Sequence, residues 1–349
     1  MNRSHHQHRY AHRLRASAAA GISLLDVVVS IAVLSLLLSL VAPAILSMRD
    51  RSQALECRNR LRQLGMAAQG RLATTGKFPK TSIPGQFDTT AGNASVAYIS
   101  TSPFRELIAS LDSNTADLIF QKEGDWGRDL AATLGHPFPP HDLGKQKIPV
   151  LICPSETQPQ ARLSYRANLG SAPSVHRSGM SQQDRLHSVG AFSNGFAITP
   201  AQFKDGMSNT VLFSERISGD FDANRYSPFR DSFRGQGNMM QVDAAMEICK
   251  TQAVATPDQP DSEAGKDWLL GGWLSSWYNH VAGPNSTVPD CESLHDFGGG
   301  DALLSARSLH SGFVNAGFAD GSVQSVADEI AIDVWRAMGT REAIDTQSE

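Results

Sequence analysis

One long apolar segment dominates the pattern of hydrophobic and polar positions along the chain. Residues 22–46 read ISLLDVVVSIAVLSLLLSLVAPAIL, and Asp26 is the one charged side chain among them. At about 1.5 Å per residue, a helix of this length crosses a hydrocarbon layer of roughly 30 Å. The pattern therefore predicts a membrane-spanning helix rather than a buried core helix. A removable secretory signal, cleaved near Ala42-Pro43-Ala44, is the other alternative, although the apolar run is longer than such signals usually carry.

Helical periodicity continues beyond the apolar segment. The apolar residues Leu55, Leu61, Leu64, Ala68 and Leu72 recur at spacings of three and four or their multiples, with arginines at many positions between them. The segment TTGKFP at 74–79 then supplies a Gly and a Pro as stop signals. The pattern predicts one helix over residues 22–72, whose first half spans a membrane and whose amphipathic second half packs on the following domain.

From residue 80 onward, short apolar runs alternate with Gly, Pro, Asn and Asp. These runs predict short helices at 104–111 and 126–134, and strands at 148–153, 210–215, 314–319 and 322–326. Asp320-Gly321 separates the last two strands, and we expect a hairpin with a type I′ turn, in which both residues have positive φ. The predicted fold class is α+β, with a long N-terminal helix, transmembrane in its first half, packed on a mainly antiparallel β-sheet of an outer domain.

Composition and charge add a leader to this organisation. The chain has 349 residues, a net charge of −4, 41% hydrophobic and 19% charged residues, which is typical of a folded protein and gives no argument for nucleic-acid binding. No acidic residue precedes Asp26, whereas several arginines do, so residues 1–21 are predicted to be a basic leader. Arginines also follow the apolar segment, and charge alone therefore does not orient it. The predicted domains are the leader (1–21), the helix (22–72) and an outer α+β domain (73–349) with a variable polar insertion near 217–265.

The cysteines point to disulfides rather than to a metal motif. Cys57, Cys153, Cys249 and Cys291 all follow the apolar segment, and no two of them form a CxxC pair, so a zinc ribbon or thioredoxin-like motif has no support. If the region after the helix lies outside the cytoplasm, an even number of cysteines favours one or two disulfides. The spacing leaves all three complete pairings open.

The residues at the start of the apolar segment carry a more specific signal. The segment AGISLLD at 20–26 resembles the cleavage and methylation segment of type IV prepilins. The resemblance implies that a prepilin peptidase cuts after Gly21, that Ile22 becomes the methylated N-terminus, and that Asp26 pairs with the amino group of a neighbouring subunit. A carboxylate inside a membrane is costly without such a partner; the alternative is that Asp26 lies at the headgroup boundary. The family usually has Glu at the position of Asp26 and a basic residue at that of Ala20.

A second resemblance extends over most of the chain. The sequence is similar to a prepilin-like family catalogued as domain-of-unknown-function family 1559, which carries a C-terminal His-x9-Asp-Gly box. The matching segments are the start at Gly21, CRNRLRQLG at 57–65, CPS at 153–155, SYRANLG at 164–170, DGMSNT at 205–210 followed by Glu215, GPNS at 283–286 before Cys291, and His310 followed nine residues later by Asp320-Gly321. The family pattern implies the disulfide Cys57–Cys153, and a second disulfide Cys249–Cys291 would then enclose the variable insertion.

The resemblance also implies a function and a location. Family members are regarded as pseudopilin-like structural subunits without catalytic activity, processed by prepilin peptidase and associated with a type II secretion or type IV pilus-like system. The expected partners are prepilin peptidase, other pilin-like subunits, the secretion platform of the inner membrane and the membrane itself, with no nucleic acid. The expected location is the inner (cytoplasmic) membrane, crossed once, with the C-terminal domain in the periplasm or at the cell surface.

An alternative is a membrane-anchored protein that uses the prepilin segment only for export and binds a solute or glycan. Trp268, Trp273 and Trp277 are then the candidates for stacking on a sugar, although tryptophans at these intervals are more often core residues.

The chemistry-bearing residues favour structural roles over catalysis. His310 and Asp320 could share a proton, but Asp320 and Gly321 are already explained by a turn. The serines beside His310 lie in no nucleophile-elbow sequence, which argues against a hydrolase. We therefore expect no catalytic residue in this chain.

Metal sites have equally weak sequence signals. Asp205, Gly206 and Asn209 form a turn motif. The oxygens of Asp205, Asn209 and Glu215 are also candidates for binding calcium, although their spacing does not match the EF-hand pattern. A second candidate is the acidic cluster of Asp290, Glu292, Asp296 and Asp301. Cys291, His295 and His310 fit no zinc spacing. We expect no cofactor or metal, with calcium as the least disfavoured ion.

Overall fold

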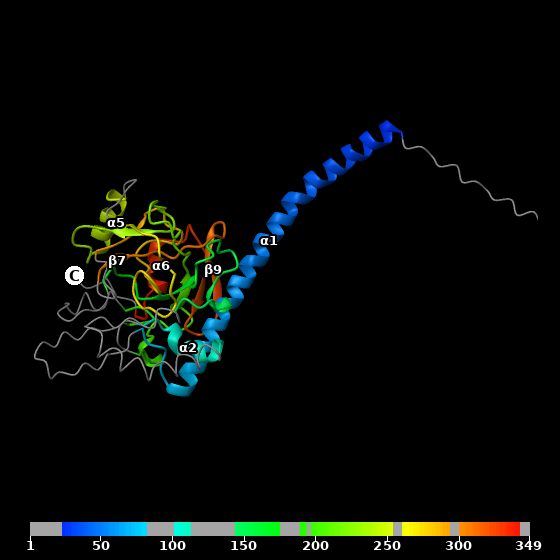
Figure 1. Ribbon diagram of the computed structural model, residues 1–349. Helices are drawn as coiled ribbons and strands as arrows, with labels where there is room; N and C mark the ends of the chain where they lie inside the picture. The colour runs from blue at the N-terminus through cyan, green and yellow to red at the C-terminus, as the bar shows by residue number, and fades with distance from the viewer. Residues whose placement is uncertain are drawn as a thin grey trace, which may run out of the picture. The chain divides into compact units, whose positions relative to one another are not determined.

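The computed structural model describes residues 23–81, 101–112, 144–174, 189–193, 197–253, 260–293 and 300–342 (Figure 1). The predicted leader and the predicted helix at 126–134 lie outside these residues. The chain divides into two compact units, Met1–Arg49 and Asp50–Glu349, which we call the N-terminal unit and the C-terminal unit. The predicted domain boundaries at 21 and 72 stay predictions.

Helix α1 (Leu24–Thr75) contributes residues to both units and contains Pro43. All its described side chains in the N-terminal unit are exposed. By length and composition this stretch could cross a membrane, and a signal sequence near an N-terminus would pass the same test. The helix ends where Gly76, at a φ of 71°, donates its N–H to Leu72 O at 2.8 Å, a conformation that glycine adopts without strain. The helix is therefore confirmed, and it ends three residues later than predicted.

The C-terminal unit is an α+β domain. Its helices and 3₁₀ helices are α2 (Phe104–Leu111), η2 (Pro149–Leu151), η3 (Pro200–Gln202), α5 (Val242–Thr251) and α6 (Ile332–Met338). Its strands are β1 (Tyr165–Asn168), β2 (Val211–Glu215), β3 (Ser232–Arg234), β4 (Pro260–Asp261), β5 (Trp277–Tyr278), β6 (Asp290–Glu292), β7 (Ala302–Leu303), β8 (Phe313–Phe318) and β9 (Val323–Ala327). This mixture of helices and strands confirms the predicted α+β fold class.

The strands form two mixed, mainly antiparallel sheets. The larger sheet has the order β5-β1-β2-β8-β9, in which the pair β1–β5 is parallel and the other pairs are antiparallel. The smaller sheet has the order β4-β3-β6-β7, in which only the pair β3–β6 is parallel within the described residues. Strands β1, β2 and β8, in the middle of the larger sheet, are almost entirely buried.

The amphipathic part of α1 packs in the main core of the C-terminal unit. Leu61, Leu64 and Ala68 are fully buried there, as the spacing predicted, whereas Leu55 is 60% exposed. Helix α1 comes close to the turn between β8 and β9: a Cβ added to Gly65 would lie 3.2 Å from the Cα of Gly321. Burial of apolar surface, which stabilises by about 25 cal/mol per Å², is the main contribution that holds this half of α1 to the domain.

The hairpin at the C-terminal end of the sheet is confirmed, but its turn is not type I′. Strands β8 and β9 pair from Phe313↔Ala327 to Gly317↔Val323. Gly321 N donates to Phe318 O at 2.9 Å, and Gly321 has a φ of 88°, whereas Asp320 does not have a positive φ. A type I turn followed by a left-handed glycine, the usual three-residue hairpin loop, needs only one such residue. Asp320 instead accepts a hydrogen bond from Ser322 N at 2.8 Å.

One further segment differs from the predictions. Residues 148–153 do not form a strand: Pro149 begins the 3₁₀ helix η2, because a proline has no N–H for a sheet ladder and a φ suited to a helix start. The predicted polar insertion near 217–265 contains β3, α5 and β4. These elements are held by pairing with β6 and by a disulfide, which local sequence patterns do not reveal.

Candidate functional site

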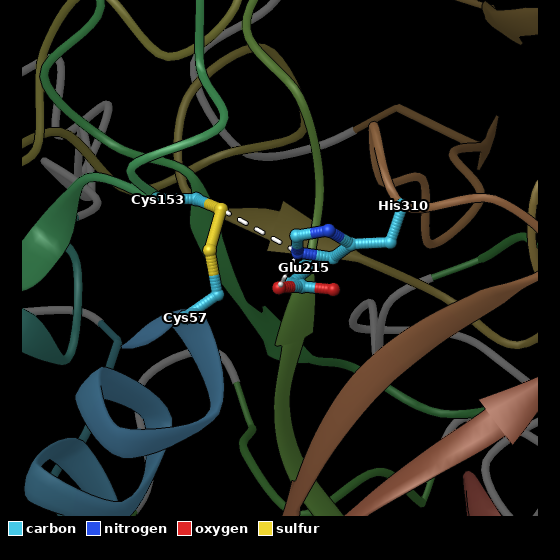
Figure 2. A group of neighbouring side chains, drawn as sticks. All are labelled: Cys57, Cys153, Glu215 and His310. Atoms are coloured by element: carbon cyan, nitrogen blue, oxygen red, sulfur yellow. Dashed lines mark hydrogen bonds and ion pairs between the residues drawn. A yellow bond between two sulfur atoms is a disulfide. The ribbon is translucent and has the colours of Figure 1, made fainter. Parts of the chain in front are cut away.

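Four side chains that are far apart in the sequence meet at one point of the C-terminal unit (Figure 2). Cys57 comes from α1, Cys153 from the loop after η2, Glu215 from the end of β2, and His310 from the loop before β8. One ligand atom of each lies within 4.8 Å of those of the others, and all four residues are buried. Each residue belongs to a different one of the segments that carried the family resemblance.

The two cysteines of this cluster are joined by a disulfide, with a Cα–Cα distance of 5.1 Å. The bond ties α1 to the segment after η2. Arg60, one turn further along α1, donates to the carbonyl oxygens of Pro149 and Ile152 and so holds the same two segments together. Tyr165 of β1 donates its hydroxyl to Cys57 O at 3.3 Å.

Glu215 is a buried carboxylate whose oxygens are held by hydrogen bonds. Asn315 donates its backbone N–H to Oε2 at 2.7 Å and its side-chain Nδ2 to Oε1 at 3.1 Å. The Nε2 atom of His310 lies 3.2 Å from the same Oε1 atom. A buried charge is tolerated only when such partners replace water. The site therefore gives Glu215 a fixed orientation.

His310 directs one ring nitrogen at both of its neighbours. Its Nε2 atom lies 3.2 Å from Glu215 Oε1 and 3.7 Å from Cys153 Sγ, and its ring stacks on Phe313 with the centroids 5.4 Å apart. A catalytic triad uses both ring nitrogens, one for the nucleophile and one for the orienting carboxylate. Since a single nitrogen makes both contacts here, the arrangement does not relay a proton from Cys153 to Glu215. It instead resembles ligands that converge on a common centre.

His310 and Asp320 are not brought together. They lie beyond opposite ends of β8, Asp320 in the exposed hairpin turn and His310 buried against β2. The spacing of the His-x9-Asp-Gly box thus reflects the length of one strand with its flanking loops. Glu215, which the sequence suggested as a calcium candidate and as the residue that follows the turn motif, is the actual carboxylate partner of His310.

A small cavity lies beside the cluster and has room for about one water molecule, with a volume of about 10 Å³. Cys153, Glu215, Ser164 and Ser308 contribute to its lining. The Oγ atom of Ser164 is buried and has no hydrogen-bond partner in the part of the chain that the structure describes. The cavity therefore presents an unpaired polar group next to the disulfide and the carboxylate.

The calcium candidates do not form a site in the described residues. Asn209 donates its Nδ2 to Asp205 O at 2.7 Å in a turn before β2, with Gly206 at a φ of 93°, while Glu215 lies at the far end of that strand. In the acidic cluster, Asp301 accepts a hydrogen bond from Ser174 Oγ at 2.6 Å. Asp296 and His295 lie outside the described residues.

Asp290, another member of that cluster, belongs to a buried ion network. It pairs with Arg216 at 2.8 Å and with Arg307 at 3.0 Å, and all three side chains are at most 1% exposed. Burial by itself would raise the pKa of Asp290, but the two guanidinium groups outweigh it and lower that pKa. The network therefore keeps the carboxylate ionised inside the domain.

No local sequence pattern indicated that Asp290 pairs with two buried arginines. A third arginine, Arg166 of β1, is also fully buried and donates to Trp273 O at 3.2 Å. Burial, followed by the charge of nearby Arg216, lowers the pKa of Arg166 well below its usual range. The one available signal was an arginine within the segment SYRANLG at 164–170, which belongs to the family resemblance.

The tryptophans proposed for sugar stacking lie in the core. Trp268, Trp273 and Trp277 are at most 1% exposed, and the rings of Trp273 and Trp277 pack edge to face with centroids 5.7 Å apart. A ring that stacks on a sugar needs an exposed face. These residues therefore stabilise the domain and are not a glycan platform.

Both predicted disulfides are present. Besides Cys57–Cys153, Cys249 of α5 is joined to Cys291 of β6, in a separate hydrophobic cluster. Of the predicted processing residues, Gly21 and Ile22 lie outside the described residues. Asp26 lies in the first turn of α1, where its Oδ2 atom accepts a hydrogen bond from Ser23 N at 3.1 Å. This is half of a capping box, which stabilises a helix start.

By its fold, this chain belongs to the class of proteins in which an apolar N-terminal helix is followed by an α+β domain with disulfides. More specifically, the chain belongs to the family described as "Protein of unknown function (DUF1559)", whose model matches residues 47–333. The match confirms the family named in the wider resemblance; the prepilin-type segment at 20–26 and the His-x9-Asp-Gly box stay predictions. No curated protein and no solved structure matches the chain.

Proposed function

We propose that this protein is a pseudopilin-like structural subunit. The observation that carries the proposal is the division of α1: its first half presents apolar side chains to the surroundings, and its second half belongs to the core of the C-terminal unit. A helix of this kind anchors a domain to a membrane and offers an apolar surface to other helices. The His310–Glu215 arrangement lacks the geometry of a catalytic relay, which supports a structural, non-enzymatic role.

Processing by a prepilin peptidase follows from the segment AGISLLD at 20–26. Cleavage after Gly21 creates a cationic amine at Ile22, and this amine is the natural partner for a carboxylate within the membrane. In one subunit, Asp26 caps α1; in an assembly, it accepts the amine of a neighbour. The partners are then the peptidase, other pilin-like subunits and the inner-membrane platform of a type II secretion or type IV pilus-like system, and the domain lies in the periplasm or at the cell surface.

The N-terminal mass of the mature protein tests this proposal. When the full chain is co-expressed with a prepilin peptidase, we expect it to start at N-methylated Ile22. The variant Gly21→Val should keep the leader, because a branched side chain replaces the small residue at the cut, whereas Ala18→Val should be processed normally. A mature chain that starts at Ile45 would show ordinary signal removal and contradict the proposal.

A second candidate function is a membrane-anchored binding protein. The observation in its favour is a groove of about 300 Å³ between α1 and the β8–β9 hairpin, lined by residues that include Arg51, Leu55 and Phe313. This volume is at the lower end for small-molecule pockets. Thermal-shift measurements of the detergent-solubilised chain with a panel of sugars and anionic solutes would detect such a ligand, and Leu55→Trp should then abolish the shift.

A further inference from the structure

The cluster around the Cys57–Cys153 disulfide has the dimensions of a metal centre. In tetrahedral zinc sites, the metal lies about 2.3 Å from sulfur and about 2.0–2.2 Å from nitrogen and oxygen, so a sulfur–nitrogen edge measures roughly 3.6 Å and a nitrogen–oxygen edge roughly 3.4 Å. The distance from Cys153 Sγ to His310 Nε2 is 3.7 Å, and that from His310 Nε2 to Glu215 Oε1 is 3.2 Å. All four ligand atoms lie within 4.8 Å of one another. To complete the tetrahedron, the two bonded sulfur atoms must separate to roughly 3.8 Å.

The surroundings of the cluster support its ligands as a zinc site requires. Asn315 orients the carboxylate of Glu215, and Phe313 stacks on the imidazole of His310. Such supporting contacts fix the direction of zinc ligands in known sites. The adjoining cavity, with the unpaired hydroxyl of Ser164, has room for about one water molecule beside Cys153 and Glu215. Two thiolates, one imidazole and one carboxylate are also the ligand types that zinc prefers.

We propose that reduction of the Cys57–Cys153 disulfide converts this cluster into a tetrahedral zinc site formed by Cys57, Cys153, Glu215 and His310. A dithiol reductant donates two electrons and two protons to the disulfide, is itself oxidised to a disulfide, and leaves two thiols. One Zn²⁺ then displaces the two thiol protons and binds both thiolates, Nε2 of His310 and a carboxylate oxygen of Glu215. The disulfide links α1 to the segment after η2, whereas zinc links both of these to the end of β2 and the loop before β8.

The second disulfide is a natural control for this proposal. Within the described residues, the cluster around Cys57 is the one group of His, Cys, Asp and Glu side chains whose ligand atoms converge in this way. Cys249 and Cys291 lie in an apolar cluster with Phe233 and Met239. Reduction of that disulfide therefore exposes thiols without creating a zinc site.

Metal binding by the reduced full chain tests the proposal. The chain is purified in detergent with both disulfides intact, reduced with a trialkylphosphine and titrated with Zn²⁺ or Co²⁺. We expect one metal ion per chain after reduction and none before it, with the near-ultraviolet thiolate bands and intense visible bands of tetrahedral cobalt. The double variant Cys249→Ser/Cys291→Ser should bind equally well, whereas Cys57→Ser/Cys153→Ser should not bind.

Variants of the other two ligands distinguish a built site from loose binding by thiols. Glu215→Gln and His310→Phe are first shown to be folded by the melting of their oxidised forms and then reduced. We expect their affinity for zinc to fall by more than the roughly 10- to 100-fold that loss of a supporting partner costs, while the exposed control Glu329→Gln keeps the wild-type affinity. The proposal is overturned if the reduced chain binds no zinc, or if Glu215→Gln and His310→Phe bind it as tightly as the wild type.

Discussion

The Nε2 atom of His310 lies 3.2 Å from the Oε1 atom of Glu215, although 95 positions separate the two residues in the chain. The contact joins the end of β2 to the loop before β8, beside the disulfide that links α1 to the segment after η2. Four segments of the fold, namely α1, the loop after η2, the end of β2 and the loop before β8, therefore meet at one point, where a covalent bond and the hydrogen bonds of one buried carboxylate hold them. This relationship makes Glu215 the residue whose replacement should be most informative.

Replacement of Glu215 by Ala should destabilise the C-terminal unit by about 1–3 kcal/mol, because it leaves the buried N–H of Asn315 without an acceptor. Glu215→Gln, which keeps an oxygen acceptor, should cost less. Thermal unfolding of the oxidised chain, followed by circular dichroism, measures both effects. Glu329→Gln, at an exposed position, is the matched control. Equal melting temperatures for Glu215→Ala and this control would contradict the role assigned to the carboxylate.

Loss of either disulfide should destabilise the folded state, and the loss of Cys57–Cys153 should cost more. The bonds close loops with sequence separations of 96 and 42 residues. If a disulfide acts mainly by restricting the unfolded chain, these loops correspond to about 4.7 and about 3.9 kcal/mol. Denaturant unfolding of Cys57→Ser/Cys153→Ser and Cys249→Ser/Cys291→Ser compares the two. The reverse order would mean that packing around α5 contributes more than chain entropy.

His280 should make the protein less stable in acid. Its Nδ1 atom lies 2.7 Å from Trp335 O and its Nε2 atom 2.9 Å from the hydroxyl of Tyr278, and it is fully buried. Burial lowers the pKa of His280 from 6.5 to about 3, so the folded protein holds a neutral imidazole that donates to Trp335 and accepts from Tyr278. Between pH 6.5 and about 3, the unfolded chain therefore binds one more proton than the folded chain at this residue.

As the pH drops below 6.5, His280 should consequently lower the free energy of unfolding by about 1.4 kcal/mol per pH unit. Unfolding curves at a series of pH values, measured for the wild type and for His280→Gln, isolate the contribution, because glutamine does not titrate. We expect the variant to be less stable at neutral pH and to have a shallower slope in acid. Parallel slopes would show that His280 is not the group responsible.

Asp26 should be needed for assembly but not for processing. Asp26→Asn keeps an oxygen that accepts the hydrogen bond from Ser23 N, but it removes the charge; Asp26→Glu keeps the charge and has the acid usual in prepilins. We expect Asp26→Asn to lower incorporation into filaments by at least about tenfold, the effect of losing about 1.4 kcal/mol. Asp26→Glu should assemble at least as well as the wild type.

Quantification of the subunit in sheared surface fractions measures assembly, and the N-terminal mass measures processing of the same variants. Both variants should start at Ile22. If Asp26→Asn assembles like the wild type, the hydrogen bond to Ser23 N is the only role of Asp26, and the pairing with a neighbouring amine is excluded.

Local patterns were sufficient for the elements that depend on neighbouring residues. The burial of Leu61 and Leu64 follows from helical periodicity, and the hairpin around Gly321 follows from two apolar runs with a turn sequence between them. The details that failed depend on backbone geometry or on distant partners. Pro149 starts a 3₁₀ helix in an apolar run that looked like a strand, and Asp320 keeps a negative φ because the glycine after it carries the turn.

The sequence by itself determined the long helix, the α+β class, the hairpin and, through the family pattern, the disulfide partners, because each depends on periodicity, on turn residues or on an ordered series of motifs. Only the tertiary structure decided which carboxylate faces His310. Asp320 is nearer in sequence, but β8 separates it from the histidine, whereas the pairing of β2 with β8 brings Glu215 to it. Sheet register acts between strands about a hundred residues apart, and no local pattern encodes it.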